Sequence, residues 1–102
     1  MKLSLIICTY QRPEALRKLL DSVALQTMKP DEIIIVDGSR DDLTSKMIKE
    51  VAVSNVNYFR VSEKDRGLTK QRNFGIEKTD FNTEIIGFLD DDVILEAEYF
   101  EQ

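Results

Sequence analysis

Three consecutive carboxylates, Asp90, Asp91 and Asp92, are the residues of this sequence best suited to chemistry. They directly follow the apolar run 85–89. Neighbouring negative charges repel one another, so such a run normally lies in solvent unless a cation or hydrogen-bond donors compensate the charge. A buried strand leading into the triplet makes simple solvent exposure less favoured. The triplet therefore has two interpretations, an acidic surface turn or a site for a divalent metal ion.

The composition limits the ligands that this chain is expected to bind. The 14 Lys and Arg residues against 19 Asp and Glu residues give a net charge of −5, so nucleic acid is not an expected partner. The chain has no histidine and a single cysteine, Cys8, which argues against a zinc site and excludes an internal disulfide. An oxygen-bound metal ion such as Mg²⁺ or Mn²⁺ stays open.

The length and hydropathy indicate one domain, residues 1–102, with 42% apolar and 32% charged residues. The apolar stretch 3–8 is too short and too interrupted for a secretion signal. No segment approaches the roughly 20 apolar residues of a membrane-spanning helix. We expect a cytoplasmic chain, with any membrane association arising from regions outside it.

Apolar runs alternate along the chain with segments of helical periodicity. The runs expected to form strands are 3–8, 33–36, 56–61 and 85–89, with the third at a sheet edge because of its mixed composition. The expected helices run from Pro13 to before Pro30, around 44–51, over 68–77, and from 96 to 102. This order predicts an α/β fold, a three-layer βαβαβαβ unit with a parallel sheet and right-handed crossovers.

Polar residues follow three of these strands at the point where each ends. They occupy positions 9–12, 37–39 and 90–92. In open parallel sheets, ligands bind beyond the carboxyl ends of the strands, where the strand order reverses. Three loops that converge on one rim favour the metal interpretation of the acidic triplet.

Several other ligand-binding patterns are missing. The turn 9–13 has no glycine, as a dinucleotide-binding fold would require, and no phosphate loop occurs anywhere. An EF-hand starting at Asp37 would need Gly and Glu where Asp42 and Ile48 stand. A phosphoacceptor receiver domain needs acids after the first strand, where Thr9 and Tyr10 stand. After these exclusions, one kind of site remains. It has acids on two strand ends, a metal ion, and basic residues that bind a diphosphate, and nucleotide-sugar binding meets that description.

Five blocks of residues, covering nearly the whole chain, share the order and spacing of one known family. They are 8–12; Ser22, Gln26, Thr27, Pro30 and Glu32; Val36 and Asp37; Gly67, Arg72, Asn73 and Gly75; and 88–92. With these blocks the chain resembles the nucleotide-binding half of a family 2 glycosyltransferase. The resemblance implies the GT-A fold, a Rossmann-like fold of nucleotide-diphospho-sugar transferases, here truncated.

The resemblance also implies roles for individual residues. Thr9 and Asp37 correspond to positions that touch the base and ribose, and Arg72 to a basic residue near the base or diphosphate. Asp90 and Asp92 correspond to the two ends of the family's Asp, any residue, Asp motif, in which a Mg²⁺ or Mn²⁺ ion would bridge the two phosphates. The implied nucleotide-sugar-binding residues are Thr9, Tyr10, Arg12, Asp37, Arg72, Asp90 and Asp91, and the implied metal ligands are Asp92 and Asp90.

The activity implied by the resemblance is metal-dependent transfer of a sugar, with inversion, in polysaccharide or glycoconjugate biosynthesis. The donor would be a UDP-, GDP- or dTDP-sugar, and the acceptor a sugar or lipid-linked glycan. No catalytic residue is assigned, because the general base is expected beyond Gln102. The chain would then supply the donor and metal site and be inactive alone. The alternative is a non-catalytic α/β interaction module, and in either case an exposed sheet face is expected to favour oligomers.

Some positions depart from the family pattern or have a simpler explanation. Gly38 stands where the family usually has a second acid, and Gln71 where alanine is common. Asp37 could instead cap the following helix. Arg72 could be a surface residue paired with Glu63 or Asp65. Cys8 is better explained as a small strand residue than as a nucleophile.

Overall fold

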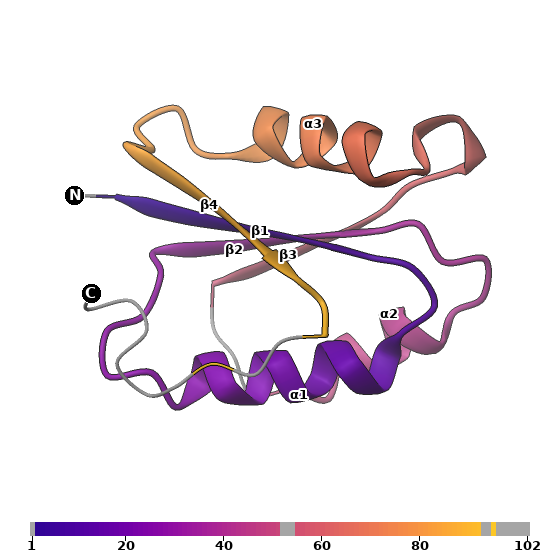
Figure 1. The fold of residues 1–102 in the computed structure, drawn as a ribbon, viewed down its shortest axis with the longest axis horizontal. Helices are drawn as coiled ribbons and strands as arrows, with labels where there is room; N and C mark the ends of the chain where they lie inside the picture. The colour runs from indigo at the N-terminus through magenta and orange to yellow at the C-terminus, as the bar shows by residue number, and fades with distance from the viewer. Residues whose placement is uncertain (1, 52–54, 93–94, 96–102) are drawn as a thin grey trace.

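Four parallel strands form one sheet between helices on its two faces (Figure 1). The computed structural model describes residues 2–51, 55–92 and 95. The expected helix at 96–102 lies outside the described residues. The elements are β1 (Leu3–Thr9), α1 (Pro13–Ala24), β2 (Glu32–Asp37), α2 (Leu43–Ile48), β3 (Val56–Arg60), a 3₁₀ turn (Glu63–Asp65), α3 (Leu68–Lys78) and β4 (Ile85–Asp90).

The strand order β3-β2-β1-β4 confirms the predicted parallel sheet and the edge position of the third strand. The central strand β1 pairs on one side with β2, where Ile6 lies opposite Ile34, and on the other side with β4, where it lies opposite Phe88. The chain therefore builds outward from β1 to β3 and then crosses to the other side of β1. That reversal places a topological switch point at the carboxyl end of β1.

Alternating apolar residues of the central strands belong to two separate hydrophobic cores, one on each face of the sheet. Leu5, Ile7, Ile33 and Ile35 face α1 and α2, whose buried residues Leu16, Leu19, Leu20, Val23 and Met47 complete that layer. Ile6, Ile34 and Val36 face the opposite side, with Phe74 of α3 packed against them. Both faces of β1 and β2 are covered, which explains why their sequences are continuous apolar runs and do not alternate with polar residues.

Helix α1 ends earlier than expected, at Ala24 and not close to Pro30. The backbone N–H of Gln26 donates to the Val23 carbonyl at 3.1 Å, which tightens the last turn. Leu25, directly after the helix, is 76% exposed, so no inward-facing apolar residue extends the buried stripe past Val23. The apolar face of the helix, and with it the packing that stabilises helical backbone, stops there.

A polar network closes the amino end of the sheet. Glu32 accepts hydrogen bonds from the Ser4 hydroxyl and from the Asp80 backbone N–H. Lys2 forms an ion pair with Asp80, with its Nζ 2.7 Å from Oδ2. These contacts join β1, β2 and the segment that leads into β4 at the end of the sheet opposite the acidic triplet.

The outer edge of β4 has no neighbouring strand in the described part of the chain. Ile85, Ile86 and Phe88 of this strand are 45%, 36% and 41% exposed. Among the described residues, no helix is long and apolar enough to cross a membrane.

Candidate functional site

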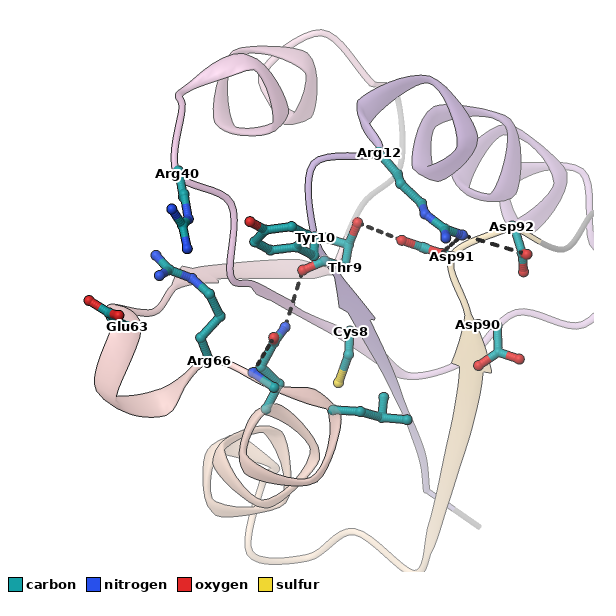
Figure 2. Close-up of a pocket in the computed structure, with 13 residues that line it drawn as sticks. Cys8, Thr9, Tyr10, Arg12, Arg40, Glu63, Arg66, Asp90, Asp91 and Asp92 are labelled. Atoms are coloured by element: carbon teal, nitrogen blue, oxygen red, sulfur yellow. Dashed lines mark hydrogen bonds and ion pairs between the residues drawn. The ribbon is translucent and has the colours of Figure 1, made fainter.

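A pocket of about 650 Å³ opens at the carboxyl ends of β1 and β4, next to the switch point (Figure 2). It lies where the parallel-sheet rule places ligands. Its lining combines the end of β1, the start of α3, the loop before it and the acidic triplet. The lining residues are Cys8, Thr9, Tyr10, Arg12, Arg40, Glu63, Arg66, Gly67, Leu68, Gln71, Asp90, Asp91 and Asp92.

The acidic end of the pocket, formed by Asp90, Asp91 and Asp92, is joined to the end of β1 by a side-chain hydrogen bond. The Thr9 hydroxyl donates to Asp91 Oδ2 at 2.8 Å, and both side chains are almost fully buried. Arg12 Nη1 lies 3.5 Å from Asp91 Oδ1 and 3.7 Å from Asp92 Oδ2. Asp91 thus has a hydrogen-bond donor in Thr9 and a compensating positive charge in Arg12. The Asp92 side chain shares Arg12 but is 59% exposed, so part of it faces the solvent in which a ligand would lie. The structure brings together Thr9, Arg12 and the triplet as the sequence suggested.

The loops after β1 and β2 are tied to one another beside this end. The backbone N–H of Gln11 donates to Ser39 Oγ at 2.7 Å, and the Gly38 N–H donates to the Thr9 carbonyl at 3.0 Å. Gln11 adopts a left-handed backbone with φ of 51°, which turns the chain sharply toward α1. The pocket rim is therefore a cross-linked pair of loops, and Tyr10 projects from it into the pocket (Figure 2).

Asp37 lies outside the pocket lining and is fully buried. Its Oδ1 accepts the Ser39 backbone N–H at 2.8 Å, and its Oδ2 accepts a hydrogen bond from the Tyr58 hydroxyl. Burial, followed by this hydrogen bond, raises the pKa of Tyr58 above its ordinary value. The alternative that Asp37 caps α2 does not describe its contacts, because its backbone partner, Ser39, precedes the helix start at Leu43.

Arg72 is also absent from the pocket lining. Its guanidinium lies over the Phe88 ring, 5.4 Å from the ring centroid, in a cation–π contact on the α3 face of the sheet. This contact anchors α3 to β4. The surface pairing of Arg72 with Glu63 or Asp65 does not occur among the ion pairs of the described residues.

Four charged or amide side chains of the pocket lining were not predicted as site residues from the sequence: Arg40, Glu63, Arg66 and Gln71. Arg40 and Arg66 face one another at the end of the pocket away from the acidic triplet (Figure 2). Arg66 Nε donates to the Gly38 carbonyl, which holds its guanidinium against the loop after β2. Gly67, with φ of +119°, forms the turn between this charged loop and α3. A glycine within a charged segment was the one feature of the sequence that could have indicated this turn.

Cys8 lines the pocket as a half-buried thiol. Burial raises its pKa to about 11, although the nearby positive charge of Arg72 opposes the shift. The thiolate is therefore scarce at neutral pH, which agrees with the interpretation of Cys8 as a strand residue and not a nucleophile.

The donor set fits a metal ion that shares its coordination with a substrate. Within the described ranges, no group of three or more Asp, Glu, Cys or His side chains could hold a metal ion alone. Asp90 and Asp92, both exposed at the pocket, are hard oxygen donors. Mg²⁺ and similar ions are commonly held by one or two carboxylates together with phosphate oxygens and water. A site of that kind needs no more protein ligands than these two.

Comparisons with known proteins agree with this architecture. Residues 4–102 match the family described as Glycosyl transferase family 2. The O-antigen chain rhamnosyltransferase RfbN of Salmonella typhimurium (strain LT2) is 33% identical over 95 residues, which are 93% of this chain and 29% of RfbN. The glycosyltransferase GlyA of Streptococcus pneumoniae serotype 4 is 30% identical over 100 residues, 98% of this chain and 14% of GlyA.

A solved structure is also similar to this chain. The crystal structure of S. aureus TarS 1-349 in complex with UDP-GlcNAc superposes with a TM-score of 0.82 at 27% identity, covering 99% of this chain and 29% of that one. The chain therefore spans less than a third of the length of each of these proteins.

Proposed function

The chain belongs to glycosyl transferase family 2, and we propose that its pocket binds the nucleotide-sugar donor of a sugar transfer reaction. One observation carries the proposal above all others. The Thr9–Asp91 hydrogen bond at the switch point gathers the acids of β4 into a pocket of about 650 Å³. That volume lies within the range of small-ligand pockets, roughly 300 to 1,000 Å³. TarS, a relative by fold and sequence, was crystallised with UDP-GlcNAc.

The charges of the pocket suit the parts of such a donor. At the acidic end, Asp90 and Asp92 would hold a Mg²⁺ or Mn²⁺ ion, which stabilises negative charge on the departing diphosphate when bound. Arg12 Nη1, within 3.5 Å of Asp91, lies where its remaining N–H groups can donate to a phosphate oxygen. Tyr10, Arg40 and Arg66 at the other end would then lie alongside the base and ribose.

The partition of roles among the three acids follows from their exposure. Asp91 is buried and already accepts hydrogen bonds from Thr9 and Arg12, so its task is to fix the turn after β4. Asp92 is more than half exposed and is the better metal ligand. The whole reaction, inverting transfer to an acceptor sugar or lipid-linked glycan, needs a general base that deprotonates the acceptor hydroxyl. We assign that base to no residue of this chain.

The proposal is tested by thermal unfolding of the purified chain with Mn²⁺ and UDP, GDP or dTDP. A nucleotide at about 100 times its dissociation constant adds about 2.7 kcal/mol of stability, which corresponds to a rise in Tm of roughly 15 °C. We expect Asp92→Ala to abolish the metal-dependent part of this rise. Asp21→Ala, which removes an exposed acid of α1 away from the pocket, is the matched control and should respond like the wild type.

A chain that shows no shift with any of the three nucleotides would refute the proposal. That result would favour the alternative, an α/β interaction module that keeps the fold without binding nucleotide.

A further inference from the structure

Gln71, in the first turn of α3, is a buried side chain whose amide joins three segments of the chain. Only 4% of its surface is exposed. Its Nε2 donates to the Val36 carbonyl at 2.9 Å and to the Thr9 carbonyl at 3.1 Å, while its Oε1 accepts the Gly67 N–H at 3.1 Å. Both amide hydrogens and the amide oxygen are therefore used, which is the condition under which a buried amide is tolerated.

These three bonds hold backbone that shapes the pocket. The Thr9 carbonyl belongs to the last residue of β1, and the Val36 carbonyl to the residue before the last of β2. Gly67 is the left-handed turn that leads the charged loop into α3. One side chain thus connects the two central strand ends with the pocket wall that carries Arg66.

The amide can occupy this place only because residue 38 has no side chain. A Cβ at Gly38 would lie 2.8 Å from Gln71 Oε1 and 3.0 Å from Arg66 Cγ. Contacts below 3.0 Å force something to move. Here Oε1, the acceptor of the Gly67 N–H, is the atom that would have to shift, and its shift would disturb that hydrogen bond. The position of the Gln71 amide therefore depends on the absence of a side chain at residue 38.

The Gln71 amide is linked to the acidic end of the pocket through Thr9. The Thr9 carbonyl accepts two hydrogen bonds, from Gln71 Nε2 and from the Gly38 N–H at 3.0 Å. With its backbone held this way, the Thr9 hydroxyl is aimed at Asp91 Oδ2. A continuous series of hydrogen bonds thus runs from α3 through Thr9 to the triplet.

We propose that Gln71 is a positioning residue for donor binding, acting through Thr9 on the acidic end of the pocket, with Gly38 as its obligatory neighbour. This inference rests on the proposed function, because it assigns Gln71 a part in the same site. Gln71 itself need not touch the metal or the phosphates. Its contribution is to preform the geometry that Thr9 and Asp91 present.

The first experiment measures nucleotide affinity by calorimetric titration of the folded chain with Mn²⁺ and the best-binding of UDP, GDP and dTDP. Gln71→Met keeps the length of the side chain and removes its hydrogen-bonding groups. We expect the affinity to fall about tenfold, since the backbone groups of three segments lose a partner. Glu77→Met, an exposed substitution on the same helix, is the control and should bind like the wild type.

A double-mutant cycle with Thr9→Val separates positioning from simple structural support. Valine keeps the branched shape but lacks the hydroxyl that reaches Asp91. If Gln71 acts through Thr9, Gln71→Met should cost little further affinity in the Thr9→Val background. Independent, additive losses would overturn the proposal, as would wild-type affinity in folded Gln71→Met.

A second cycle tests the pairing of Gly38 with Gln71 by urea unfolding and needs no ligand. Gly38→Ala should destabilise the chain, and the double variant Gly38→Ala/Gln71→Ala should lose less stability than the two single variants combined, since the clash with Oε1 is gone. Additive losses would overturn the obligatory pairing. A wild type that binds no nucleotide refutes the proposed function and the positioning role together, whereas a binding wild type with an equally binding Gln71→Met refutes the positioning role alone.

Discussion

The hydrogen bond between Tyr58 and Asp37 is the contact whose removal has the best-defined consequence. Asp37 is fully buried, and its carboxylate has two partners, the Ser39 backbone N–H and the Tyr58 hydroxyl. Tyr58→Phe removes the second partner and keeps the aromatic ring, which packs against the core between the sheet and helices α1 and α2. The variant therefore isolates the effect of leaving one carboxylate oxygen without its donor.

The magnitude follows from the burial of the acceptor. A buried polar group that loses a hydrogen-bond partner costs about 1 to 3 kcal/mol, and a charged group lies toward the upper part of that range. We expect Tyr58→Phe to lower the free energy of unfolding by about 2 kcal/mol, which corresponds to roughly 10 °C in Tm for a domain of this size.

The pH dependence of this effect has a definite sign. Burial and the bond to Asp37 raise the pKa of Tyr58 in the folded chain above the ordinary value of 10.0. Above pH 10 the unfolded chain therefore loses this proton before the folded chain does, so the folded state binds more protons and stability falls as the pH rises. The contribution of Tyr58 is complete below pH 10 and declines above it. The stability gap between wild type and Tyr58→Phe should narrow in the same direction.

Urea unfolding followed by circular dichroism, at pH 7 and at steps above pH 10, measures both quantities. Tyr10→Phe, which alters a tyrosine that is 42% exposed, provides the control and should change stability little. A Tyr58→Phe variant as stable as the wild type at pH 7 would contradict the reasoning. A gap that widened with rising pH would contradict the assigned direction of the pKa shift.

Two further predictions concern other sites. Gly75→Ala places a Cβ 2.7 Å from Ile6 Cγ2, so α3 would have to move away from the sheet, and the free energy of unfolding should fall by about 1 to 3 kcal/mol. Gly87→Ala, whose added Cβ would have no contact closer than 3.6 Å, is the control and should lose much less stability in urea unfolding. Because burial raises the pKa of Cys8 from 9.0 to about 11, its alkylation by iodoacetamide at pH 8 should be up to about a hundredfold slower than that of an unstructured thiol and accelerate toward pH 11. Rapid alkylation of the folded chain at pH 8 would show that the thiol is not shielded.

Most of the fold could be predicted because the buried strands carry their signal locally. The runs at 3–8 and 33–36 carry apolar residues on both faces, a pattern typical of strands in a sheet that is covered on two sides. The observed strands β1 and β2 begin and end within one residue of those bounds. The end of α1 was harder. The sequence predicts a helix that ends before Pro30, but the buried stripe stops at Val23. Which residues of the helix contact a neighbour depends on the packed sheet.

The candidate site was likewise predictable only where its residues follow from local sequence patterns. Thr9, Arg12 and the triplet could be brought together from sequence because strand ends of a parallel sheet share one edge. The direction of the Asp37 side chain could not, because it is set by Tyr58 on β3, a partner 21 residues away. The contact of the Arg72 guanidinium with the ring of Phe88 on β4 could not be predicted either. Such pairings depend on tertiary register, which no local pattern encodes.

The placement of β1 at the centre of the sheet has a consequence for the order in which the chain folds. The pairing of β1 with β2 closes a short loop, whereas the contact of Thr9 with Asp91 joins residues 82 positions apart. Contacts at such separation form late, because the entropy of closing the chain must be overcome first. In a refolding experiment, we expect most helical signal to return before nucleotide binding does. The ability to bind would then be the last property that the folding chain acquires.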